Sequence, residues 1–146
     1  MSIFEWGVSD ILAISGLAVK VYTAYGDAPE DYKHISDEVK SLQLKIDKAA
    51  RHFESNTLSN NNRQEGQEVL KGCESVLKDL NSLIEKYNSP SSNNTSPALQ
   101  TVKVGVEDVA TLRARLISNT ALLSSFIQRF DILTITIWYI MLISRP

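Results

Sequence analysis

The chain has 146 residues, of which 43% are hydrophobic and 22% charged, and this length suits one domain with its own core. Its 15 basic and 17 acidic residues give a formal net charge of -2, so it lacks the excess of lysine and arginine that non-specific nucleic-acid binding requires. The single cysteine, Cys73, excludes an internal disulfide, and one cysteine with two histidines cannot form a closed structural zinc site. Composition therefore favours an intracellular helical domain that binds neither nucleic acid nor structural metal.

The first apolar stretch, Ile11 to Val19, does not have the features of a targeting segment. Glu5 and Asp10 precede it where a secretory signal carries positive charge. Its nine residues are also far fewer than the ~20 that a helix needs to span a bilayer. We therefore expect neither a signal peptide nor a conventional transmembrane anchor at this position.

Hydrophobic periodicity predicts two helices in the first third of the chain. Apolar residues recur at steps of three and four from Ser9 to about Tyr25, which places them on one broad helical face. The proline junction at 27–29 predicts the start of a second helix. Its apolar residues keep an unbroken heptad spacing from Tyr32 to Phe53, so this helix must pack against others.

A third and a fourth helix follow, separated by polar segments. Asn56 to Asn62 has the composition of a loop, and a helix from about Arg63 to Tyr87 then carries two adjacent apolar rows, which predicts two neighbours. The ten-residue polar segment 88–97 contains two prolines and predicts a second loop. The fourth and longest helix should run over about 98–128.

The order of these elements predicts the fold class. No alternation of strands and helices occurs, and the connections between the expected helices are short. Short connections place successive helices antiparallel. We therefore expect an all-α fold, an antiparallel up-and-down four-helix bundle over residues 1–130, with an apolar C-terminal tail over residues 131–146.

The tail contains an unusual segment, Ile132 to Ser144, with the sequence ILTITIWYIMLIS. It carries no charge and many β-branched and aromatic residues. As a helix it would be about 20 Å long, against roughly 30 Å for the hydrocarbon core of a bilayer, so it is too short to span alone. Three interpretations remain open at this point: a tail folded onto the helices, a tail that contacts a membrane, and a stretch of non-native sequence.

Catalytic and metal-binding patterns are missing from the sequence. It contains no phosphate-binding loop, dinucleotide fingerprint, zinc-protease motif or nucleophile elbow. His34 and His52 are 18 residues apart on the second expected helix, or roughly 27 Å, and cannot bind one metal ion. Cys73 lies in an apolar row and fits a buried core position. We expect no enzyme activity, no cofactor and no small-molecule substrate.

Three stretches of the sequence carry a resemblance to a known family. They are FEWGVSDILAISGLAVKVYTAYGDAPEDYKHISDEVKSLQ, EVLKGCESVLKDLNSLIEKY and VKVGVEDVATLRARLISNTALLSSFI. Together they resemble the fungal N-terminal domain found ahead of NACHT or other STAND-type nucleotide-binding regions, over Phe4 to about Phe130. The segment from Asp131 onward does not resemble the family's continuation, and no nucleotide-binding or repeat region follows it.

The resemblance implies a HeLo-like helical bundle, similar to domains that act in heterokaryon incompatibility and regulated cell death. In such relatives, oligomerisation frees the N-terminal helix for contact with the bilayer. Transferred to this chain, the resemblance implies a membrane or oligomer face made of Trp6, Ile11, Leu12, Ile14, Leu17, Val19 and Val21. Asp10 and Lys20 would have to be accommodated at the interface or in the lumen of an oligomer.

Two functions follow from these observations. The first is a non-enzymatic signalling module of fungal self/non-self recognition or regulated cell death, which works by self-association or protein partners and by membrane contact. The second is a passive helical adaptor that binds another protein and has no membrane activity. The first implies a cytoplasmic protein that can associate with a membrane, and neither involves nucleic acid.

Overall fold

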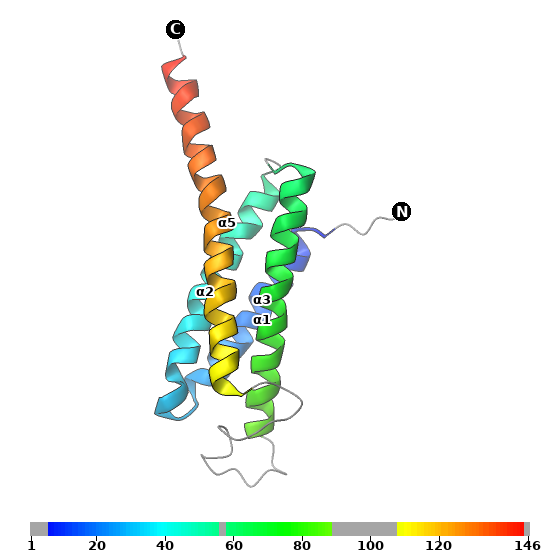
Figure 1. Ribbon diagram of the computed structural model, residues 1–146, viewed down its shortest axis with the longest axis vertical. Coiled ribbons are helices and arrows are strands. Elements are labelled where there is room, and N and C mark those ends of the chain that lie inside the picture. Colours follow the sequence, from blue (N-terminus) through cyan, green and yellow to red (C-terminus); the bar gives the residue numbers. More distant parts are fainter. Residues whose placement is uncertain (1–5, 56–57, 89–107, 145–146) are drawn as a thin grey trace.

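The computed structural model describes residues 6–55, 58–88 and 108–144, which form four α-helices and one short 3-10 turn (Figure 1). The elements are α1 (Val8–Gly26), η1 (Glu30–Tyr32), α2 (Lys33–Glu54), α3 (Asn60–Tyr87) and α5 (Val109–Ile143). The described residues contain no strand. This architecture confirms the predicted all-α four-helix bundle.

Polar residues fix where three of the helices begin. The Asp10 carboxylate accepts a hydrogen bond from the Gly7 backbone amide at 2.8 Å at the start of α1. Ser59 accepts one from the Asn62 amide at 3.1 Å at the start of α3, and Asp108 accepts one from the Thr111 amide at 2.8 Å at the start of α5. Each side chain satisfies an amide that has no partner inside the first turn of its helix.

Contacts between the helices show how they are arranged. α1 and α2 are antiparallel, because Ser15 donates to Asp47 at 2.7 Å while Ser36 donates to the carbonyl of Tyr22 at 2.7 Å. α5 lies between α2 and α3, and it contacts both. Its direction is that of α2 and opposite to that of α3 (Figure 1).

The helices therefore run alternately up and down along the chain, as predicted. Consecutive helices are not always close neighbours, however. α2 and α3 are joined by a short connection but touch only weakly, and each packs instead against α1 and α5. The two apolar rows of α3 accordingly face α1 and α5, which confirms the prediction of two neighbours.

The core consists of the residues that the periodicity selected. The buried positions of α2 are Ile35, Val39, Leu42, Ile46, Ala49, Ala50 and Phe53, and those of α3 include Leu70, Cys73, Val76, Leu77, Leu80 and Leu83. Tyr25 of α1 is fully buried among them and donates a hydrogen bond to the carbonyl of Leu80 at 2.8 Å. This bond satisfies the one polar atom that Tyr25 brings into the core.

Two boundaries differ from the predicted ones. α3 begins at Asn60 rather than Arg63, because Ser59 caps it, and Leu58 just before the cap is buried although its segment is otherwise polar. α5 does not end near Gln128 but continues to Ile143. The residues 98–107 that were expected to begin the fourth helix lie outside the described residues, as does most of the expected 88–97 loop.

Candidate functional site

The most unusual surface of the molecule is the C-terminal part of α5, residues 132–143, which we call the apolar extension. It projects beyond the ends of the other three helices (Figure 1). Its side chains Ile132, Leu133, Ile135, Ile137, Trp138, Tyr139, Ile140, Met141, Leu142 and Ile143 are 48% to 67% exposed. Soluble proteins rarely expose a contiguous apolar surface of this kind unless it binds something.

The apolar extension has no polar face. Successive residues of an α-helix point about 100° apart, so the seven exposed apolar residues from 137 to 143 cover every direction around the axis. No charged residue lies between Ile132 and Ser144. A helix that is hydrophobic all round is a helix that becomes buried on all sides, inside a protein or inside a membrane.

The bundle ends where the apolar extension begins. The rings of Phe126 and Phe130 lie 4.8 Å apart, and His52 of α2 lies 2.8 Å from the carboxylate of Asp131. Arg129 stacks over both phenylalanine rings, at 5.5 and 5.3 Å, and pairs with Glu65 of α3. These contacts hold α5 firmly to α2 and α3 up to Asp131, and the next residue is already 63% exposed.

This geometry decides one of the three interpretations of the tail. Because the extension continues α5 outward with its side chains exposed, it is not folded back onto the helices. Membrane contact and non-native sequence both stay predictions. The periodic signal could not make this choice, because a segment that is apolar at nearly every position has no preferred face.

The seven N-terminal candidates do not form one surface. Ile11, Ile14 and Val21 are 2% exposed or less and belong to the core, whereas Leu12 and Val19 are 52% and 39% exposed on the outer side of α1. Trp6 and Leu17 are half-buried against the core. In this conformation α1 can present only Leu12 and Val19 fully to a membrane or an oligomer, and the prediction for the full set requires α1 to leave the bundle.

Two helices, α1 and α5, are long and apolar enough to cross a membrane by length and composition. They differ in what covers them. Along α1 the apolar side chains at 11, 14, 18, 21 and 25 are in the core of the bundle. The apolar extension has no such cover, so α5 is the stronger candidate for membrane contact.

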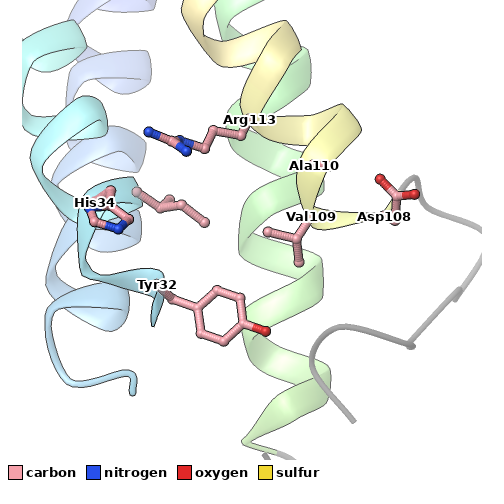
Figure 2. A pocket seen from close by; sticks show the side chains of 7 residues that line it. Tyr32, His34, Asp108, Val109, Ala110 and Arg113 are labelled. Carbon is pink, nitrogen blue, oxygen red and sulfur yellow. The ribbon is translucent and has the colours of Figure 1, made fainter. Parts of the chain in front are cut away.

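A hollow of about 410 Å³ lies between the start of α2 and the start of α5 (Figure 2). Tyr32 and His34 line one side, and Asp108 lies on the other side, at the start of α5. Arg113 reaches toward α2, where it pairs with Glu38 through hydrogen bonds of 2.9 and 2.8 Å. The ionisable groups therefore have structural partners or lie apart, and they do not converge on a common point.

The remaining reactive groups are structural. Burial raises the pKa of the Cys73 thiol to about 12, so almost no thiolate forms near neutral pH. Its sulfur lies 3.8 Å from the carbonyl of Asn119, as fits a core position. Within the described ranges, no three histidine, cysteine, aspartate or glutamate side chains are grouped closely enough to hold a metal ion.

Comparison with protein-family models, with curated proteins and with solved structures finds no match for this chain. The resemblance to a fungal N-terminal domain therefore stays a prediction from the sequence.

Proposed function

We propose that this chain is a non-enzymatic helical signalling module that contacts a membrane through the apolar extension of α5. The setting that the sequence implies is a fungal STAND protein acting in self/non-self recognition or regulated cell death through association of helical bundles. The observation that carries the proposal is the exposure of ten apolar side chains on the extension, on all sides of one uncharged helical segment.

A bilayer suits this surface better than a second copy of the chain. A helix pairing with one other helix buries a single stripe of side chains and leaves the opposite side in water. On the extension that opposite side would still expose large apolar groups, because residues 137–143 are apolar in every direction. The hydrocarbon core of a membrane covers all sides at once, at about 25 cal/mol for each Å² removed from water.

The length of the extension sets how deep it can reach. Its 12 residues span about 18 Å at the standard rise, which exceeds one leaflet of a core roughly 30 Å thick and falls short of both leaflets. The folded bundle then stays at the surface, with Asp131 and His52 near the level of the headgroups. Trp138 lies near the middle of the extension, in the hydrocarbon of the first leaflet.

Trp138 allows a direct test. The chain has two tryptophans, so a Trp6→Phe variant leaves Trp138 as the single reporter. On addition of lipid vesicles, its fluorescence should shift to shorter wavelength, and lipid-borne quenchers placed in the hydrocarbon should quench it. Ile140→Glu in the same background should weaken vesicle binding about a hundredfold, because a charge at membrane depth costs roughly 2.5–3.5 kcal/mol.

The matched control is Leu44→Glu, which introduces the same charge at an exposed leucine of α2 (59% exposed) far from the extension. It should leave vesicle binding unchanged. If Trp138 shows no shift with any vesicle while the protein forms concentration-dependent oligomers in solution, the membrane proposal fails and the adaptor function is supported instead.

A further inference from the structure

Basic side chains surround the point where the apolar extension leaves the bundle. Lys45, Lys48 and Arg51 lie on the C-terminal half of α2, the helix beside which α5 leaves the bundle. Two adjoining hollows, of about 160 and 310 Å³, lie between α2 and α5 there, and both are lined by Lys48 and Asp131. These hollows sit directly below Ile132, the first residue of the extension.

Positive charge exceeds negative charge in these hollows. Asp131 is the one carboxylate among the residues lining them, and it is already held by His52 at 2.8 Å. Neither Lys48 nor Arg51 makes an ion pair or hydrogen bond with any residue that the structure describes, and both are exposed. Lys45 reaches only the hydroxyl of Ser41, at 3.4 Å. The three cations are thus free to bind an anion.

Elsewhere along the bundle, cations are matched with carboxylates. Arg113 pairs with Glu38, Arg115 with Asp79, Lys78 with Glu74 and Lys33 with Glu30. The unmatched cations of α2 therefore gather at the end of the bundle from which the extension projects. If the extension enters a bilayer, that end lies at the level of the lipid phosphates.

We infer that Lys45, Lys48 and Arg51 form a binding site for the phosphate of anionic lipid headgroups, next to the base of the apolar extension. The inference rests on the proposed membrane contact of α5. Arg51 can bind two phosphate oxygens through its planar guanidinium, and the lysines add charge from the side. The apolar extension gives affinity for any bilayer, and this site selects a negatively charged one.

The test compares vesicles of phosphatidylcholine alone with vesicles that also contain phosphatidylserine, using the full chain. The wild-type protein should bind the anionic vesicles more tightly, and the preference should fall as salt shortens the screening length from about 10 Å at 0.1 M to about 3 Å at 1 M. The double variant Lys48→Gln/Arg51→Gln should lose roughly fivefold of that preference per cation removed. Its binding to phosphatidylcholine should not change.

The matched control is Lys33→Gln/Lys78→Gln, which removes the same two charges from residues away from this end of the bundle and should keep the preference. Equal wild-type binding to both kinds of vesicle, or equal effects of the two double variants, overturns the headgroup site but leaves the membrane contact standing. Failure to bind either kind of vesicle overturns both. If inorganic phosphate alone binds as tightly as anionic vesicles do, and the Lys48/Arg51 variant loses it, the ligand is a soluble phosphate and the lipid assignment is wrong.

Discussion

The two parts of α5 have nearly the same hydrophobic character and opposite surroundings. From Leu112 to Phe130, apolar residues alternate with polar ones at helical spacing, and Leu112, Leu116, Leu123 and Phe126 are at most 2% exposed. From Ile132 to Ile143 apolar residues dominate almost without a break, and ten of their side chains are at least 48% exposed. Spacing, rather than amount of hydrophobicity, separates a helix half that builds a bundle from one that waits for a partner.

The largest expected effect compares one aromatic residue from each part. Phe126→Ala removes a ring that is 2% exposed and packs 4.8 Å from Phe130, so it should lower the free energy of unfolding by about 3–5 kcal/mol. Trp138→Ala, at a residue 64% exposed, should change it by less than about 0.5 kcal/mol. Urea denaturation without lipid measures both. A loss of several kcal/mol in Trp138→Ala would show that the extension packs on the bundle in water.

A second comparison uses glycines that differ in their surroundings. A Cβ atom on Gly66 of α3 would lie 2.6 Å from the Cζ of Phe126 and 3.0 Å from the ring of Phe53. Gly66→Ala should therefore destabilise the protein by about 1–3 kcal/mol through overpacking against the bundled part of α5. Gly16→Ala is the control, because a Cβ atom on Gly16, on the exposed side of α1, would meet no atom within 4 Å.

Gly16→Ala should stabilise the protein by about 0.5–1 kcal/mol, because alanine costs less backbone entropy than glycine in a helix. Thermal unfolding of both variants gives the two signs directly. The same sign for both variants would mean that the close contact between Gly66 and Phe126 does not exist in solution.

A third prediction concerns alkaline pH. Burial raises the pKa of Cys73 from 9.0 to about 12, so above pH 9 the unfolded chain has lost this proton while the folded chain keeps it. Folding stability should therefore fall as pH rises, by about 1.4 kcal/mol per pH unit from this group, until the folded thiol also ionises. Burial raises the pKa of Tyr25 as well, and its contribution begins only above pH 10.

The variant Cys73→Ala isolates the thiol. It is less stable at neutral pH, but its stability should decline less than that of the wild type between pH 9 and pH 10, before Tyr25 contributes. Denaturation curves at these two pH values suffice. Parallel declines in the two proteins would mean that the thiol is not buried in the folded state.

The sequence predicted most of the bundle because one physical signal, the spacing of apolar residues, decides which side of each helix is buried. Ile35, Val39, Leu42 and Ile46 were expected inside and are inside. The diagonal placement of α2 and α3 was not predictable in this way, because periodicity says how many neighbours a helix has and not which ones. Leu58 was missed because a single apolar residue in a polar loop has no period.

The candidate site shows the same limit. The resemblance selected every large apolar residue of α1 around positions 11–21, but Leu12 and Val19 are seven residues apart on the outer side, while Ile11, Ile14 and Val21 share the inner side. Helical spacing alone could have separated these two groups. For the extension no such separation was possible, and only the position of the last packed residues, Phe130 and Asp131, shows where the bundle stops.

The smallest expected effect tests whether the two ends of α5 act independently. Arg113 donates from Nε and Nη2 to the Glu38 carboxylate, and these hydrogen bonds and the charge of Glu38 raise the pKa of Arg113. Both side chains are partly exposed, so Arg113→Lys, which loses the two-point geometry, should cost about 1 kcal/mol or less at low salt and nothing measurable near 1 M salt. A double-mutant cycle with Glu38→Gln isolates the pair. Because this pair ties α5 to α2 at the end opposite to the extension, vesicle binding should not change; a change there would mean that the packed part of α5 controls how the apolar extension is presented.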